Sequence, residues 1–167
     1  MQGQQVLRQA SALTLIGGAT ALAAGVGAAA SPAKSLRTRL WFARLRKPRF
    51  QPPARVFGPV WGLLYPTIAW SGYRTWAAPA SEDRRRALRW WTAQLALNAL
   101  WTPLFFGGQR PVLALADSAL LLGSAANYTR VARNVDKTAA RAMVPYLGWL
   151  AFALVLNAGI VTRNRKR

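Results

Sequence analysis

The sequence contains no cysteine and no histidine, and only 4 of its 167 residues are acidic. The absence of cysteine excludes disulfides, thiolate metal sites, iron–sulfur clusters and a cysteine nucleophile. The absence of histidine removes the most common general base and the most common ligand of zinc and haem. With so few carboxylates, a catalytic pair of acids is also disfavoured. The composition therefore predicts a protein that needs no cofactor and no metal, and that is not an ordinary enzyme.

Positive charge is abundant: 23 Lys and Arg give a formal net charge of +19, although 53% of the residues are hydrophobic. Such a charge can indicate nucleic-acid binding, but these cations are clustered. Between the clusters lie five stretches with no charged residue except Asp117 and arginines near their ends. Each is long enough to cross about 30 Å of hydrocarbon, which takes roughly 20 apolar residues. The predicted spans are residues 9–33, 56–76, 88–109, 111–130 and 142–162.

We therefore predict an all-α integral membrane protein, a bundle of five transmembrane helices within residues 9–164. Residues 1–8 form an N-terminal tail and residues 165–167 a basic C-terminal tail. The expected partner is the lipid bilayer, and no nucleic acid. We expect a multi-pass protein of a bacterial cell membrane, with the mitochondrial outer membrane or another organelle membrane as alternatives.

Five spans place the two termini on opposite sides of the membrane. Side A holds the loop of residues 34–55, the turn at residues 107–110 and the C-terminus; side B holds the N-terminus and the other two loops. Side A carries 13 of the 23 Lys and Arg, which leaves 10 for side B. The positive-inside rule counts these residues, and it weakly favours side A in the cytoplasm.

The first span has two other interpretations. A cation followed by an apolar run and small residues can form a signal peptide, and an Arg-rich, acid-poor N-terminus can be an organelle address. The uncharged run is long for a signal peptide, however, and its small residues Gly17, Ala21, Gly25 and Ala29 are spaced four apart. This spacing favours a membrane helix that a neighbouring helix can approach closely.

Aromatic and amide side chains recur at helical spacing inside three of the spans. Trp70, Trp76, Trp90 and Trp91 flank one loop on side B and are typical of an interfacial belt. The residues predicted to line one cavity open to side A are Trp61, Tyr65, Asn98, Trp101, Phe105, Tyr146, Trp149 and Ala153. Large rings with a few amides suit a flat, apolar ligand that bears a carbonyl or carboxylate. The alternative is that the polar members only join helices.

Two further polar residues, Asp117 and Asn157, lie inside different spans at similar depths below side A. Polar groups in hydrocarbon are costly, so both are expected to face the bundle interior. They either hold helices together or, in the case of Asp117, serve a small transporter as a proton or ion site.

The loop of residues 34–55 is unusually rich in proline and aromatic residues. Proline fixes φ and removes a backbone donor, so we predict that Pro48, Pro52, Pro53 and Pro59 prevent a long helix. Trp41, Phe42, Phe50 and Phe57 are too apolar for a solvated linker. We expect the loop to fold back over the mouth of the bundle as a lid. A basic loop that only touches anionic lipid head groups is a compatible alternative.

Four motifs carry a family resemblance. The segments KPRFQPP and FGPVWGLLYP, then QLALNALWTPLFF and VPYLGWLAFALVLNAGI, follow one another in register. They resemble the first loop and the second, third and fifth helices of the tryptophan-rich sensory protein family, also called the translocator protein or peripheral benzodiazepine receptor family. The resemblance implies a five-helix bundle that forms a homodimer, and binding of porphyrin-like flat ligands, with sterols in some members.

The resemblance also assigns site residues. It implies that the family's ligand-pocket tryptophan is Trp61, that its helix-three asparagine is Asn98, and that the tryptophan after Pro-Tyr is Trp149. The loop tryptophan of the family is Phe50 here, and the tyrosine of the C-terminal sterol motif is missing. The implied function is a membrane receptor or carrier of porphyrin-like ligands. The alternatives are light- or oxygen-dependent breakdown of porphyrins and a small transporter that uses Asp117.

Overall fold

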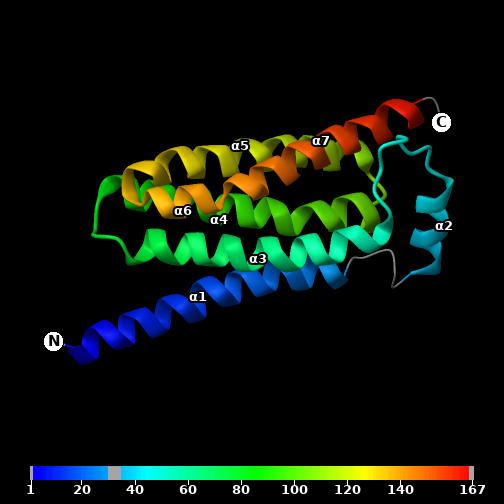
Figure 1. Ribbon diagram of the computed structural model, residues 1–167. Helices are drawn as coiled ribbons and strands as arrows, with labels where there is room; N and C mark the ends of the chain where they lie inside the picture. The colour runs from blue at the N-terminus through cyan, green and yellow to red at the C-terminus, as the bar shows by residue number, and fades with distance from the viewer. Residues whose placement is uncertain (1, 30–34, 166–167) are drawn as a thin grey trace.

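Long α-helices packed side by side form the part of the chain that the computed structural model describes, residues 2–29 and 35–165 (Figure 1). Side chains are described at residues 10–12, 14–26 and 35–165. The long helices are α1 (Gln2–Ala29), α3 (Ala54–Ala77), α4 (Glu82–Thr102), α5 (Pro111–Val135) and α7 (Val144–Asn164). Shorter helices are α2 (Leu36–Arg44), α6 (Lys137–Ala142) and a π-helix at Pro103–Gly107 that extends α4. No strand occurs within the described ranges, and the predicted all-α bundle is confirmed.

Helix starts follow local sequence signals. Ser81 accepts a hydrogen bond from the Arg84 N–H at 3.1 Å, and Glu82 and Asp83 occupy the first turn of α4, where the helix dipole favours negative charge. Pro111 begins α5, a position at which its missing N–H costs nothing. At the other end of α5, Asp136 caps α6 by accepting from the N–H groups of Thr138 and Ala139.

The helix bounds differ from the predicted spans where charged residues continue a helix. α1 already begins at residue 2 and includes residues 2–8 of the predicted tail, and α4 begins at Glu82, six residues before the predicted span. The last span is divided at Met143, which separates α6 from α7. Residues 30–33 of the first predicted span and residues 166–167 of the C-terminal tail lie outside the described residues.

Judged by length and hydropathy alone, a single helical stretch within the described ranges can cross a membrane. This stretch is Lys137–Asn164, with a mean hydropathy of 1.8. α1 adds a shorter apolar stretch, Ala10–Val26. The other long helices carry amides, hydroxyls or terminal arginines, which lower their average hydropathy.

Prolines act differently in the loop and in α3. α2 ends at Arg44, before Pro48, and residues 45–53 are not helical. Pro59 and Pro66, by contrast, lie inside α3, so the prediction that Pro59 prevents a helix was wrong. Phe57, which was assigned to the loop, is also part of α3. The helix continues because each proline removes only one i→i−4 hydrogen bond and packing holds the rest.

Close packing of α3 against α4 depends on one glycine. A Cβ at Gly72 would lie 2.5 Å from Cε2 of Trp91. The indole of Trp91 is buried there, and its Nε1–H donates to the Ile68 carbonyl at 3.0 Å. The prediction that Trp91 belongs to an interfacial belt was therefore wrong, because its ring packs between helices; Trp70 is exposed, and Trp76 and Trp90 are half-buried.

α1 packs on α3 and α4 through a face other than the predicted one. Its buried residues are Ala12, Ile16, Thr20 and Ala23. Gly17 and Gly25 are exposed, and no atom lies within 4 Å of a Cβ built on either. The prediction that these small residues admit a neighbouring helix was wrong for the helices of this chain; the side chain of Ala29 is outside the described residues.

Hydroxyl groups and an ion pair join the helices at side B. The Tyr128 hydroxyl lies 2.7 Å from Ser71 Oγ and 2.8 Å from Thr75 Oγ1, and Ser71 donates to the Ala139 carbonyl at 2.8 Å. Next to them Arg74 pairs with Asp136 at 2.8 Å. α3, α5 and α6 are therefore connected by polar contacts where the helices leave the apolar core.

The ion pair predicts loss of stability in acid. Burial alone would raise the pKa of Asp136, but hydrogen bonds from the Ala139 and Thr138 amides and from Arg74 outweigh it, so the pKa lies below its usual value. A depressed pKa stabilises the fold above the unfolded-state value of about 3.9, and this contribution is lost as the pH falls through the folded-state value. Asp136→Asn should lower the melting temperature at neutral pH, and the difference from wild type should shrink below about pH 4. Thermal unfolding in detergent measures this, and an unchanged gap at acidic pH would contradict it.

Candidate functional site

A chain of three hydrogen bonds crosses the centre of the bundle and links α3, α4 and α7. The Tyr65 hydroxyl donates to Asn98 Oδ1 at 2.9 Å, and Asn98 Nδ2 donates to the Tyr146 hydroxyl at 3.1 Å. The Tyr146 hydroxyl donates in turn to Gln94 Oε1 at 2.9 Å. We call Tyr65, Gln94, Asn98 and Tyr146 the amide–tyrosine network. Three of them are buried and Tyr65 is half-buried, so the network reaches the bundle surface only at Tyr65.

Aromatic rings continue from the network toward side A along α3 and α7. The Trp61 ring lies 5.1 Å from that of Tyr65 and 6.3 Å from that of Tyr146. Trp149 contacts Phe57 edge-on, with 5.6 Å between ring centroids, and lies 5.5 Å from Phe152. We call Phe57, Trp61, Trp149 and Phe152 the ring wall. Trp61 and Trp149 are half-buried, and each therefore keeps part of its apolar surface uncovered.

Side chains, rather than close backbones, connect α3 to α7. The two helices approach each other at few points, and the ring wall fills the space between them. Two surface hollows of the described ranges, one along α4 and one beside α2, are lined by other residues. Neither of these two hollows is therefore the predicted open cavity.

Two predicted site residues, Trp101 and Phe105, lie in a different cluster. Their rings stack on each other, with centroids 4.9 Å apart, and Trp41 of α2 contacts Phe105 edge-on at 5.6 Å. Trp101 is one turn closer to side A than Asn98, and the π-helix changes the angular spacing after Thr102. The structure therefore does not place Trp101 with Trp61 and Trp149. Ala153, one turn after Trp149 on α7, is half-buried.

The lid segment, residues 45–53, is docked on α7. Pro48 is buried, and its Cγ would lie 2.6 Å from a Cβ placed on Gly159. Asn164 holds the Arg46 backbone at both ends: Oδ1 accepts from the Arg46 N–H at 3.1 Å, and Nδ2 donates to its carbonyl at 3.0 Å. Phe50 contacts Phe152 edge-on at 6.3 Å. The lid therefore reaches the ring wall through Phe50; Pro52 is half-buried and Pro53 precedes α3.

Asp117 of α5 and Asn157 of α7 are buried polar residues on two helices that pack against each other. Asn157 Nδ2 donates to Oγ of Ser118, the residue next to Asp117, at 3.4 Å. Both carboxylate oxygens of Asp117 are buried and have no hydrogen-bond partner, and Asn157 Oδ1 has none either. A buried carboxyl group without a donor is costly when charged, so the interface between α5 and α7 holds a group suited to carrying a proton.

Three residues of the site were absent from the set predicted to line it. Phe57 and Phe152 belong to the ring wall, and Gln94 ends the amide–tyrosine network. Phe57, Trp61 and Tyr65 are spaced four apart on α3, and this spacing could have indicated that Phe57 belongs to the site. Phe152 is recognised only when the position of Phe50 is known.

Comparison with known proteins agrees with this architecture. The sequence profile of the TspO/MBR family matches residues 18–163. The chain is 42% identical over 119 residues to the translocator protein of Homo sapiens, a match that covers 70% of each chain. It is 39% identical over 143 residues to the tryptophan-rich protein TspO of Archaeoglobus fulgidus, covering 86% of this chain and 91% of that one. Against the tryptophan-rich sensory protein of Cereibacter sphaeroides the identity is 34% over 144 residues, covering 86% and 89%. The chain therefore belongs to the TspO/MBR family of membrane helical bundles.

Proposed function

We propose that this protein is a multi-pass membrane receptor or carrier for a flat, apolar, porphyrin-like ligand that enters between α3 and α7. The observation that carries the proposal is the ring wall beside the amide–tyrosine network. Trp61 and Trp149 are half-buried and keep part of their ring surface uncovered, and Tyr65 is the half-buried end of the hydrogen-bond chain. A macrocycle would stack on the indoles, and a polar group at its edge would bond to the network.

Binding requires the rings to move. Because side chains and not tightly packed backbones join α3 to α7, rotation of Trp61 and Trp149 opens space at little cost to the helices. Carboxylates on the rim of the ligand would meet the cations of side A, where Arg46, Lys47 and Arg49 belong to the lid segment. A metal-free tetrapyrrole fits best, because the chain has no histidine or cysteine to ligate iron.

Trp61→Ala and Trp149→Ala should each weaken binding of protoporphyrin by about tenfold, since each removes a stacking surface. Titration in detergent, followed by the Soret band of the ligand, measures the affinity without using tryptophan as the reporter. Trp70→Ala, an exposed tryptophan on the same helix as Trp61, is the matched control and should bind like wild type.

Wild-type affinity in both ring-wall variants would refute the proposed site. The same samples test the breakdown alternative under illumination. Loss of the Soret band that needs light and both tryptophans would show that the protein degrades the ligand, whereas reversible binding in the dark supports a receptor or carrier.

A second candidate, a proton- or ion-coupled carrier, is favoured by the unpartnered carboxyl group of Asp117. In this case Asp117→Asn should abolish substrate flux into liposomes driven by a pH gradient, because the amide cannot release a proton. Ser118→Ala changes the adjacent residue without removing the acid and serves as the control. Flux that survives Asp117→Asn would exclude this mechanism.

A further inference from the structure

Ion pairs are distributed unevenly between the two ends of the bundle. Within the described ranges, the ion pairs join Arg74 to Asp136 and both Arg85 and Arg89 to Glu82. All of these lie at side B. The arginines and the lysine of α2, of the lid segment and of the α4–α5 turn have no carboxylate within 4 Å in those ranges. Side A therefore presents a group of cations whose anionic partners are not supplied by the described chain.

An open hollow of about 450 Å³ lies among these cations, between α2 and the turn that joins α4 to α5. The lining residues are Leu36, Arg37, Leu40, Trp41, Arg44 and Gln109. Arg37 and Arg44 stand two turns apart on one face of α2, about 10 Å along its axis, so they flank the hollow. The lining therefore combines two unpaired guanidinium groups with apolar side chains.

α2 has the features of a helix that lies in a membrane interface. Figure 1 shows it running across the end of the bundle instead of along it. Leu36 and Leu40 are exposed by 70% and 50%, directly beside the arginines. Trp41 anchors the helix to the bundle through its contact with Phe105. Apolar residues next to cations on a surface helix are typical of segments that insert between lipid head groups.

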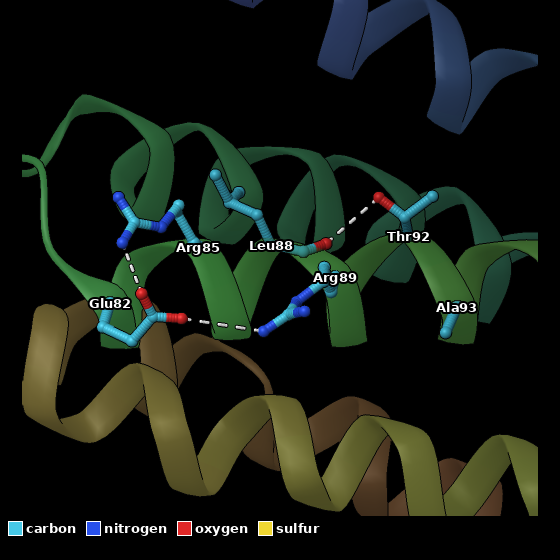
Figure 2. A pocket seen from close by; sticks show the side chains of 6 residues that line it. All are labelled: Glu82, Arg85, Leu88, Arg89, Thr92 and Ala93. Carbon is cyan, nitrogen blue, oxygen red and sulfur yellow. Dashed lines mark hydrogen bonds and ion pairs between the residues drawn. The ribbon is translucent and has the colours of Figure 1, made fainter.

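The other hollow supplies an internal comparison. It has a volume of about 750 Å³ and lies along α4 at side B, where it is lined by two arginines, Arg85 and Arg89. Figure 2 shows both guanidinium groups directed at Glu82, which forms an ion pair with each of them. In the hollow at α2 no acid plays this role. The arginines of the hollow at side B thus have an acidic partner within the chain, whereas those of the hollow at side A have none within the described ranges and are available to an external anion.

We propose that the hollow at α2 binds the phosphate head group of an anionic phospholipid from the side A leaflet. Arg37 and Arg44 hold the phosphate from its two sides, and Leu36 and Leu40 lie against the upper part of the acyl chains. Guanidinium groups suit phosphate because they donate in a planar fork. This site is separate from the ring wall and does not depend on the proposed ligand.

The test is a titration of the full chain, in neutral detergent and without porphyrin, with phosphatidylglycerol. The melting temperature should rise with phosphatidylglycerol and not with phosphatidylcholine, because binding to the folded state stabilises it. Arg37→Gln together with Arg44→Gln should weaken the apparent affinity about tenfold or more, since each arginine near a lipid surface contributes to binding. Both side chains are exposed, so the double variant should fold like wild type.

Arg85→Gln together with Arg89→Gln is the matched control, with the same loss of charge at the paired hollow, and should keep wild-type affinity for phosphatidylglycerol. An affinity loss of less than about threefold in the Arg37/Arg44 variant would overturn the proposal. So would an equal loss in the control variant, which would indicate a general charge effect. Stabilisation by inorganic phosphate alone, equal to that by the lipid, would show that the site takes a free anion and would also overturn it.

Discussion

Gly72→Ala should lower the free energy of unfolding of the bundle by about 1–3 kcal/mol, a large effect for the addition of one methyl group. The added Cβ would lie 2.5 Å from Cε2 and 2.7 Å from Nε1 of Trp91. The indole cannot rotate away freely, because it is buried and its Nε1–H is bonded to the Ile68 carbonyl. Either α3 and α4 separate or this hydrogen bond is lost. Thermal or chemical unfolding in detergent measures the loss.

Gly62→Ala is the matched control on the same helix. No atom lies within 4 Å of its Cβ position, and the residue is exposed. The same substitution there should be neutral or slightly stabilising, because alanine favours helix over glycine by up to about 1 kcal/mol. Equal stability of the two variants would show that α3 and α4 do not approach as closely as described.

Gly159→Ala should release the lid segment from α7. Its Cβ would lie 2.6 Å from Cγ of Pro48, inside van der Waals contact, so the proline must move. Pro48 lies two residues after Arg46, whose backbone is held by Asn164, and two before Phe50, which contacts Phe152. Displacement at Pro48 therefore loosens both neighbouring contacts.

Trypsin provides the measurement, because Arg46 and Arg49 lie within the lid segment. Cleavage there should become about tenfold faster or more in Gly159→Ala, since overpacking shifts the equilibrium toward the undocked lid. Gly148→Ala, on the same helix with no atom within 4 Å of its Cβ, should be cut at the wild-type rate. Protection of the lid in both variants would mean that Pro48 is not packed on Gly159.

The sequence predicted the helices well because a membrane constrains length and charge directly. A long run without charge is stable in hydrocarbon only as a helix. Each of the five long helices contains most of one predicted run, although within the described ranges only Lys137–Asn164 has both the length and the hydropathy to cross a membrane. The aromatic and amide residues of the site were recognised for a related reason: Tyr65, Asn98 and Tyr146 are polar groups that must find partners in the interior. Two of the misjudged positions, Pro59 and Trp91, are places where local preference and helix packing disagree.

Composition and charge pattern alone thus determined that the chain is a helical membrane bundle with its cations at the helix ends and its polar groups turned inward. The tertiary structure decided which faces meet. Helical spacing gives the direction of a side chain around its own axis but not the rotation, depth or separation of neighbouring helices. Those depend on contacts between distant residues, such as Gly72 with Trp91 and Pro48 with Gly159. For this reason Trp101 packs with Phe105, which also contacts Trp41 of α2, whereas Trp61 and Trp149 belong to the ring wall between α3 and α7.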